Sequence, residues 1–164
     1  MALPNKILPG FSAALYCQPT ASPTPLTTAQ LALVASVSPI AVSGNLLPVE
    51  AIPAFGQDDA VASFSVAGSR QSDKIPAQSA PTSLTITAAW NPSDANILLM
   101  RGDATSGVVD RTFVVSATDG TNIIYYAFNG RVSQFQIDAA PGAEAKCTFT
   151  VHPRGNQYGW SNNA

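Results

Sequence analysis

Three stretches of the sequence alternate between apolar and polar residues, and this pattern constrains the fold more than any other feature. They span residues 84–90, 112–118 and 145–151. In the last stretch every odd position is apolar and every even position is polar. Because successive side chains of a strand point to opposite faces, this alternation predicts antiparallel strands with one face on a core. Weaker alternation at residues 31–37 and 60–66 predicts two more strands.

Dipeptides that favour tight turns separate these predicted strands. Asp119-Gly120 predicts a two-residue hairpin, because both residues tolerate positive φ angles. Asn129-Gly130 fits either a second hairpin or a bend within one long strand over residues 123–137. We favour the bend, because Pro141-Gly142 supplies a stronger reversal before the last strand.

Residues 123–128 are apolar on both faces of their predicted strand. A strand of this kind is covered on both sides in the folded protein. One cover is the core, and the other is either a helix of the same chain or a neighbouring subunit. Among the sequence features, this segment points most directly to assembly.

One short helix is predicted at residues 93–101. Ser93 is a favourable N-cap, Asp94 suits the positive end of the helix dipole, and Gly102 is expected to end the helix. Residues 101–103 also spell Arg-Gly-Asp, an integrin-ligand tripeptide. Since glycine is expected at a helix end for backbone reasons, we attribute this tripeptide to chance.

The chain of 164 residues is predicted to form a single domain, residues 1–164, with three irregular segments. Residues 1–11 are interpreted as an extended N-terminal arm, and residues 155–164 as a C-terminal tail rich in Asn and Gly. Residues 43–83 contain four prolines and three glycines and are predicted to form a long loop. A loop of this length in a compact domain usually has a function.

Charged residues are scarce and scattered. They make up 11% of the chain, against roughly a quarter in average soluble domains. A subunit that hides much of its surface in an assembly needs fewer charges, so this composition favours an oligomer or a polymer. The eight Lys and Arg residues form no cluster and the net charge is −2, which argues against tight nucleic-acid binding.

Residues suited to catalysis or metal binding are few. His152 is the single histidine and lies on the polar side of the last predicted strand, which favours a surface or interface role over a general base. Cys17 and Cys147 are interpreted as buried free thiols, with a disulfide left open if their strands are adjacent. Asp58-Asp59 is interpreted as a solvated turn. The sequence therefore predicts no enzyme, no catalytic residue, no metal site and no cofactor.

The sequence predicts neither a membrane-spanning segment nor a secretory signal. Pro4 and Pro9 interrupt its apolar start, and polar residues and Pro39 break the longest apolar stretch, residues 26–42. We therefore expect a protein that does not span a membrane and is not exported by this route.

Taken in order along the chain, these features resemble those of the tail tube proteins (major tail proteins) of long-tailed bacteriophages. The strings that carry the resemblance are MALP at 1–4, GFS at 10–12, YC at 16–17, SLTITAAWNP at 83–92, DG at 119–120, FNGRV at 128–132 and CTFTVHPRG at 147–155. Together they cover most of the chain, and the 43–83 segment corresponds to a long connecting loop.

The resemblance implies a mainly β fold, an antiparallel β-sandwich or half-open barrel with one short flanking helix and a long inter-subunit loop. It implies hexameric rings that stack into a hollow tube, through which genomic DNA passes without specific binding. The expected partners are other copies of the chain, a tape measure protein, and tail tip and tail terminator proteins. The expected location is the virion tail, after assembly in the host cytoplasm.

Two contact regions are predicted within such an assembly, because exposed strand edges recruit further strands and long arms reach adjacent rings. The ring interface is predicted to include Ile124, Tyr126, Phe128 and Phe149. The contact between rings is predicted to include Leu3, Pro4, Phe55, Arg70 and Lys74.

The lumen of the tube is predicted to be neutral to acidic. Phosphates bind to clustered Lys and Arg by releasing counterions, so a lumen without such clusters lets DNA slide. A lumen lined jointly by Arg111, Arg131 and Lys146 would contradict this prediction.

Other interpretations stay open. Another β-rich virion protein, such as a capsid decoration protein, would also be non-enzymatic but would form trimers or bind a preformed shell. A carbohydrate-binding β-sandwich would present exposed aromatic residues, for which the candidates are Tyr158 and Trp160. Needle-tube subunits of contractile and secretion systems share the tube architecture, so the sequence leaves the presence of a sheath open.

Overall fold

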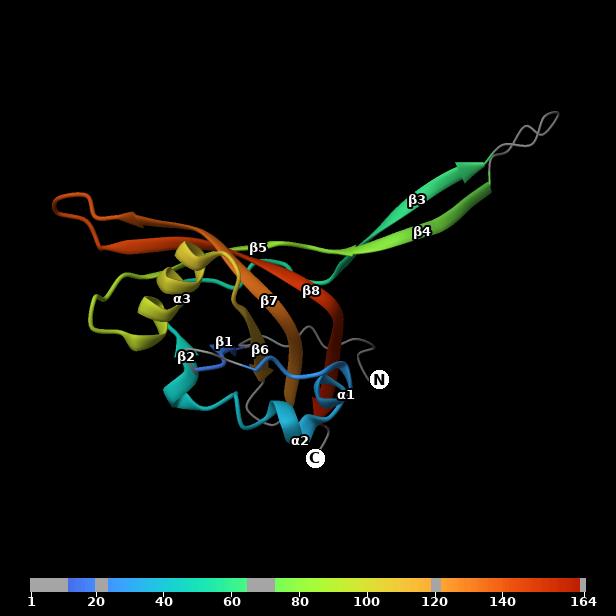
Figure 1. Ribbon diagram of the computed structural model, residues 1–164, viewed down its shortest axis with the longest axis horizontal. Helices are drawn as coiled ribbons and strands as arrows, with labels where there is room; N and C mark the ends of the chain where they lie inside the picture. The colour runs from blue at the N-terminus through green and yellow to red at the C-terminus, as the bar shows by residue number, and fades with distance from the viewer. Residues whose placement is uncertain (1–11, 20–23, 65–72, 119–121, 163–164) are drawn as a thin grey trace, which may run out of the picture.

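The computed structural model describes residues 12–19, 24–64, 73–118 and 122–162 (Figure 1). Its elements in chain order are β1 (Ser12–Cys17), α1 (Thr28–Leu31), α2 (Val34–Val37), a 3₁₀ turn (Ser43–Asn45), β2 (Leu46–Leu47), β3 (Gln57–Phe64), β4 (Asp73–Pro81), β5 (Leu84–Ala89), α3 (Ala95–Ser106), β6 (Asp110–Thr118), β7 (Ile123–Asp138) and β8 (Lys146–Asn162). The predicted mainly β fold is confirmed.

Six strands form one antiparallel sheet in the order β2-β1-β6-β7-β8-β5. The sheet curls so that its two edge strands, β2 and β5, approach each other. Strand β2 pairs with β1, and the residues after β2 contact β5: Val49 bridges to Ala88, and the Glu50 amide donates to the Thr87 carbonyl at 2.9 Å. The result is the predicted half-open barrel.

The alternating stretches point their apolar side chains into the curl. Leu84, Ile86 and Ala88 of β5 are buried beside their β8 partners. The buried core they share contains Leu15, Cys17, Leu47, Leu84, Ile86, Ala88, Ile97, Met100, Phe113, Val115, Phe128, Val132, Cys147, Phe149 and Val151. Period-two alternation therefore identified the strand faces that form the core.

Helix α3 packs on the concave side of the sheet and differs from its prediction at both ends. Asp94, not Ser93, is the N-cap, and its Oδ1 accepts from the amides of Asn96 and Ile97 at 2.9 and 3.2 Å. The helix continues through Gly102 and ends at Gly107, whose φ of 66° suits glycine. Beyond the predicted stop, Asp103 is buried and bound to Arg111, and Ala104 packs against the core, which favours continuation of the helix.

The strand predicted at residues 31–37 is wrong, because this segment forms α1 and α2. A capping box starts α1: the Gln30 amide donates to Thr27 Oγ1 at 3.3 Å, and the Thr27 amide donates to Gln30 Oε1 at 2.9 Å. Local capping, together with burial of Leu31 and Val37, outweighs the weak alternation of this segment.

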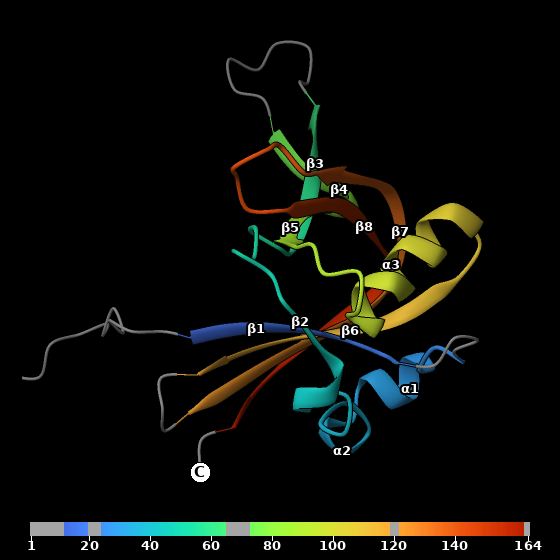
Figure 2. The ribbon, with the colours of Figure 1, turned by 90° about the vertical axis from the view of Figure 1, so that its left-hand side faces the viewer.

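Helices α1 and α2 lie against residues 123–128, the segment that is apolar on both faces of its strand. Leu31 and Val37 pack with Val114 and Ala127 on the convex side of the sheet, in a second buried cluster. Figure 2 shows α1 and α2 on that side of the strands. A helix of the same chain therefore provides part of the second cover.

Strand β7 is a single long strand, as predicted, and Gly130 lies within it. A Cβ at Gly130 would lie 2.8 Å from Val151 Cγ1 and 3.3 Å from Phe113 Cδ2, so glycine is required by close packing. The reversal predicted at Pro141-Gly142 is present, and Gly142 has a φ of 80°. Strands β6 and β7 are paired up to Thr118 and Ile123, although the predicted turn residues 119 and 120 lie outside the described residues.

The region predicted as a loop, residues 43–83, contains β2 and a two-stranded hairpin. In this hairpin β3 and β4 pair from Gln57–Pro81 to Phe64–Asp73, in agreement with the strand predicted near residues 60–66. Figure 1 shows the hairpin extending away from the six-stranded sheet. The pairing register of β3 with β4 could not be inferred from the sequence, because β4 contains two prolines and lacks clear alternation.

The irregular tail predicted at residues 155–164 is wrong for residues 155–162. These residues continue β8 and pair with β7 as far as Ile123–Asn162. A register shift near Ala127 and Asn129 and a φ of 72° at Gly155 let the strand follow the bend of β7. Tyr158 packs against the cluster under α1 and α2 rather than lying on a free tail.

Candidate assembly surfaces

One half of the sheet forms a four-strand region with open edges. This region consists of β1, β6, β7 residues 123–129 and β8 residues 154–162, and Figure 2 shows these strands side by side. The other half, the barrel region, consists of β2, β5, α3, β7 residues 130–138 and β8 residues 146–153.

Both outer edges of the four-strand region lack a partner strand among the described residues. On β1, residues 12–14 pair only with β6, because β2 reaches only Leu15 and Tyr16. On β8, residues 154–162 pair only with β7, because β5 ends its pairing at Val151. Unpaired amide and carbonyl groups of this kind accept a further strand.

The predicted ring-interface residues fall into two groups. Ile124 lies on β7 in the four-strand region with 40% of its surface exposed. Phe128 and Phe149, at 1% and 0% exposure, lie inside the subunit's own core, so their side chains have no surface to offer a neighbour. The alternation placed these two phenylalanines on the apolar face, and that face proved to be the core.

Tyr126 and Phe55, predicted for two different interfaces, contact each other within one subunit. Their ring centroids are 4.7 Å apart at an interplanar angle of 48°. The Tyr126 hydroxyl donates to Gln157 Oε1, and burial raises the pKa of Tyr126. Sequence reasoning missed Gln157 and Gly159, which support this tyrosine from β8, because residues 155–164 were not expected to form a strand.

The other predicted contacts between rings concern the hairpin and the N-terminal arm. Lys74 lies in β4, where its backbone pairs with Ser63. Leu3, Pro4 and Arg70 lie outside the described residues. The structure therefore positions Phe55 and the backbone at Lys74, and the role of all five residues stays a prediction.

The three basic residues named for the lumen each pair with a carboxylate of their own subunit. Arg111 binds Asp103, Arg131 Nε donates to Asp110 Oδ1 at 2.8 Å, and Lys146 binds Glu50. Arg154 Nη1 also reaches Asp110, with 2.9 Å to Oδ2. These ion pairs offset most of the positive charge of the three side chains.

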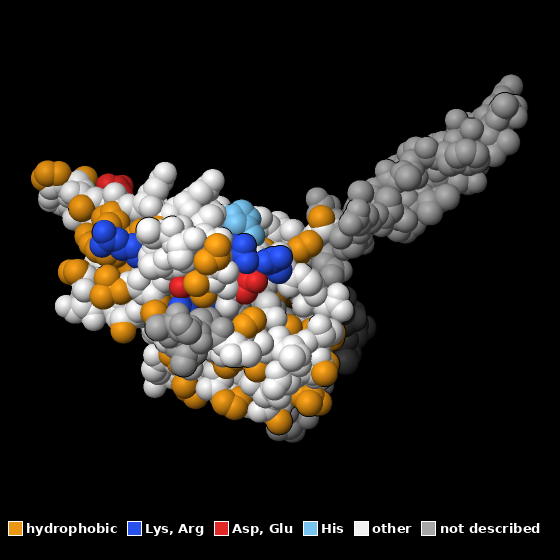
Figure 3. All heavy atoms as spheres, in the orientation of Figure 1, with side chains coloured by type: hydrophobic (Ala, Val, Ile, Leu, Met, Phe, Trp, Pro, Cys, Tyr) orange, Lys and Arg blue, Asp and Glu red, His pale blue; other side chains and the backbone are white. Residues whose placement is uncertain are grey.

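Asp110 joins β6 to both β7 and β8. Burial on its own would raise the pKa of Asp110, but the hydrogen bond and charge of Arg131, followed by those of Arg154, outweigh burial and lower it. The carboxylate therefore stays ionised at neutral pH and binds two guanidiniums at the border between the two regions. Figure 3 shows the charged side chains of this face in small groups among polar and apolar ones, without a basic stripe.

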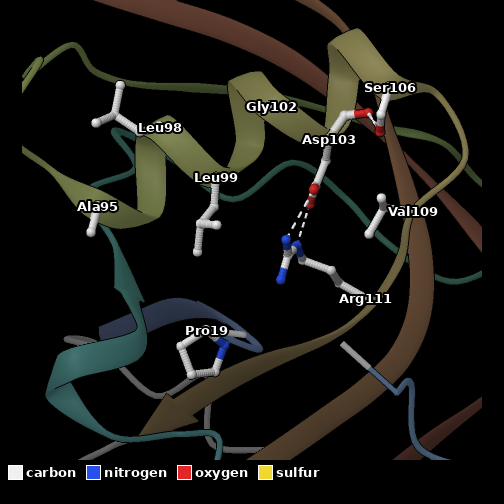
Figure 4. A pocket seen from close by; sticks show the side chains of 9 residues that line it. All are labelled: Pro19, Ala95, Leu98, Leu99, Gly102, Asp103, Ser106, Val109 and Arg111. Carbon is white, nitrogen blue, oxygen red and sulfur yellow. Dashed lines mark hydrogen bonds and ion pairs between the residues drawn. The ribbon is translucent and has the colours of Figure 1, made fainter. Parts of the chain in front are cut away.

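Of the Arg-Gly-Asp tripeptide, Asp103 is buried in the subunit, whereas Arg101 and Gly102 are exposed. Asp103 is buried in α3, where its Oδ1 accepts from Arg111 Nη2 at 2.9 Å, and Arg111 Nη1 donates to the Gln18 carbonyl at 3.1 Å. Asp103 and Arg111 line a hollow of about 620 Å³, and Figure 4 shows the pair among the other lining residues. The apolar wall of the hollow includes Leu98, Leu99 and Pro19. Asp103 is thus a structural ion-pair partner.

The other residues considered for catalysis or metal binding, His152, Cys17 and Cys147, are hydrogen-bonded or buried within the subunit. The His152 ring lies between two serine hydroxyls, with Ser83 Oγ 2.9 Å from Nδ1 and Ser133 Oγ 2.7 Å from Nε2. Cys17 and Cys147 are buried and free, on strands that β6 and β7 separate within the sheet. Burial raises the pKa of Cys17 to about 12 and also raises that of Cys147.

The described residues offer neither a metal-binding cluster nor a membrane-spanning helix. Nowhere in this part of the chain do three or more His, Cys, Asp or Glu side chains come together in a way that could hold a metal ion. No helix within the same residues has the length and apolar character needed to cross a membrane.

Comparisons with known proteins identify the fold through solved structures. No protein-family model and no curated protein sequence matches the chain. The chain is similar to one in the cryo-EM structure of the sheath/tube terminator of an extracellular contractile injection system, PVC, in its extended state. The identity is 12%, the TM-score is 0.66, and the match covers 97% of this chain and 99% of the other.

Two further structures show the same likeness. The six-fold symmetrised baseplate of the anti-feeding prophage (AFP) matches at 11% identity and a TM-score of 0.62, over 98% of this chain and 97% of the other. The SPP1 tail tube, determined by solid-state NMR and cryo-EM, matches at 10% identity and a TM-score of 0.54, over 90% and 75%. The chain therefore has a phage tail tube-like fold, as the resemblance implied.

Proposed function

We propose that this chain is a structural subunit of a phage-like tail tube. In this proposal six copies close into a ring, rings stack into a hollow tube, and the genome passes through the lumen. The observation that carries the proposal is the pair of open edges on the four-strand region, on β1 and on β8. The likeness in fold to the SPP1 tail tube supports it.

Strand direction explains how copies would join. Each neighbouring pair among β1, β6, β7 and β8 is antiparallel, so β1 and β8 run in opposite directions. The β8 edge of one copy can therefore pair in antiparallel fashion with the β1 edge of the next. A contact between two different edges repeats head to tail, and closing the ring leaves no edge open. Ile124 and Tyr126 would lie in or beside this interface.

Stacking of rings would use the β3–β4 hairpin. A two-stranded hairpin alone is only marginally stable in water, so an extended hairpin gains stability from a surface to lie on. The hairpin forms its own two-stranded sheet, apart from the main one. We assign the contact between rings to it and to the N-terminal arm, with Leu3, Pro4, Phe55, Arg70 and Lys74 as contact residues.

The charge distribution suits a tube through which DNA slides. The net charge is −2, and Arg111, Arg131 and Lys146 are each paired with a carboxylate in the subunit. Few cations are then left to release counterions from phosphates. The role is non-enzymatic and located in the virion tail after assembly in the host cytoplasm, with tape measure, tail tip and terminator proteins as partners.

A contractile injection system is the second candidate setting for the same tube. The matches to the PVC and AFP assemblies span nearly the whole of both chains, which favours this alternative. A sheath protein from such a system that coats purified tubes would support it, whereas bare tubes would favour an unsheathed tail.

Negative-stain electron microscopy of the purified, concentrated protein at neutral pH tests the proposal. We expect hollow tubes or six-fold rings, while stable trimers would favour a capsid decoration protein. Ile124→Asp places a charge in the proposed interface and should abolish rings while leaving a folded monomer. Ile137→Asp is the matched control, since Ile137 lies on the same strand with 44% exposure but outside the four-strand region. Normal tubes from Ile124→Asp would contradict the proposed interface.

A further inference from the structure

Phe55 is an apolar residue that lies between the two proposed contact surfaces. One residue, Gly56, separates it from the start of the β3–β4 hairpin at Gln57, and it keeps 39% of its surface exposed. The rest of its ring covers Tyr126 of β7 at a centroid distance of 4.7 Å. An aromatic pair of this geometry has a preferred orientation, so it fixes direction as well as distance.

Tyr126 is itself held by the open-edged part of β8. Its hydroxyl donates to Gln157, and its ring lies over Gly159, where an added Cβ would be 3.1 Å from Tyr126 Cδ2. Its other side packs toward Phe128, with a centroid distance of 6.3 Å. The position of this tyrosine therefore depends on β8 residues that lie along the open edge.

The hairpin leaves the molecule from a narrow base. The Thr82 amide donates to the Gly56 carbonyl at 3.1 Å, and Gly56 has a φ of 148°, which side chains rarely allow. Beyond this base β3 and β4 pair with each other and not with the main sheet. A contact close to the base therefore controls the direction of the whole hairpin.

We infer that Phe55 is a positioning residue that fixes the direction of the β3–β4 hairpin by resting on Tyr126. Through Gln157 and Gly159, this direction is coupled to the β8 edge. The inference deepens the proposed function and rests on it for its biological meaning: a neighbour bound along β8 would hold Tyr126 still and so orient the hairpin for stacking. Closure of a ring would thus favour addition of the next ring.

The direction of the hairpin can be measured without assembly. Spin labels at Lys74→Cys on β4 and Ser93→Cys before α3 report the distance from the hairpin to the body by pulsed electron paramagnetic resonance. The native thiols do not interfere, because Cys17 and Cys147 are buried and the pKa of each is raised. In the dilute full-length protein we expect a narrow distance distribution.

Variants of the contact then test the inference. Phe55→Ala should broaden the distribution severalfold, and Phe55→Tyr should restore it, at unchanged melting temperature. Gly159→Ala should also broaden it by displacing Tyr126, whereas Gly44→Ala, with no atom within 4 Å of the added Cβ, should not. An unchanged narrow distribution in Phe55→Ala would overturn the inference.

Electron microscopy separates this inference from the proposed function. If Gly159→Ala forms rings but severalfold fewer or shorter tubes than Gly44→Ala, the coupling to stacking is supported, because neither glycine is among the proposed contacts between rings. If Phe55→Ala stacks as well as the unmodified protein, the coupling is wrong while the tube proposal stands. If the unmodified protein forms neither rings nor tubes, the proposed function fails, and the distance measurement still decides whether Phe55 positions the hairpin.

Discussion

The barrel region and the four-strand region share β7 and β8 but differ in what surrounds these strands. In the barrel region β8 has a partner on both sides, and its inward residues, such as Cys147 and Phe149, are fully buried. In the four-strand region β8 has one partner, and Ile124 on the adjacent β7 remains partly exposed. Both regions contribute residues to the core, but only the four-strand region has open edges and exposed apolar side chains beside them that are available to a neighbour. Stability and assembly should therefore respond to different mutations.

A comparison of Phe149→Ala with Ile124→Ala tests this division, and it has the largest expected effect. Phe149 is fully buried, so its truncation should cost about 3–5 kcal/mol of unfolding free energy. Ile124→Ala should cost about 1 kcal/mol or less, because part of this residue already faces solvent. Urea denaturation of the monomers provides the comparison. Equal losses at the two positions would contradict the division.

Breaking the buried ion pair between Asp103 of α3 and Arg111 of β6, which connects the two regions, should have a comparable effect. Asp103→Ala leaves the Arg111 guanidinium buried without its carboxylate, which should cost about 3–5 kcal/mol. Asp103→Leu combined with Arg111→Met should recover most of that loss, because no buried charge remains. The double variant should also retain assembly if the pair is purely structural. Loss of tubes at full stability would give the pair a role at an interface.

Gly130→Ala acts where the two regions meet. The new methyl group would lie 2.8 Å from Val151 Cγ1, so β7 and β8 must separate slightly. We expect a loss of about 1–3 kcal/mol, measured by thermal and urea unfolding. Gly102→Ala is the matched control, since it meets no atom within 4 Å and should be neutral or stabilising. A neutral Gly130→Ala would show that the border is less tightly packed than the barrel region.

The smallest effect concerns pH and Asp110, which also lies at this border. Its pKa in the folded protein is below the ordinary value of 3.8, so its ion pairs stabilise the fold above that pH. This contribution is lost as the pH falls from about 4 through the lowered pKa, because protonation removes the carboxylate charge. Asp110→Asn should flatten the stability profile in that acidic range. An unchanged profile would mean that Arg131 and Arg154 add nothing to stability there.

The sequence predicted several strands of the main sheet well because each carries its own pattern. Alternation located β5, β6 and the first half of β8, and the Asn129-Gly130 bend within β7 followed from competing turn signals. The second half of β8 was missed because residues such as Asn156 and Gly159 resemble a flexible tail, and their strand conformation depends on pairing with β7. Helices α1 and α2 were missed because a weak alternating pattern was given more weight than the capping box at Thr27.

Only part of the candidate site could be predicted from the sequence, and the reason is physical. An apolar strand face looks the same in sequence whether it meets the subunit's core or a neighbour, so Phe128 could not be distinguished from Ile124. The contact between Phe55 and Tyr126 joins residues far apart in the chain and leaves no local signal. The open edges depend on sheet order, which no periodicity reports.

The sheet order also has a consequence for the timing of synthesis. Strand β1 is made first but pairs with β6, whose residues follow almost a hundred positions later, so folding depends on contacts between distant parts of the chain. The open part of β8, residues 154–162, is made after β1 and after every strand between them in the chain. A nascent chain thus lacks one of the two edges needed for joining until all six strands of the sheet have been made. Polymerisation would be delayed until each subunit can fold fully, which protects the cell from premature aggregates.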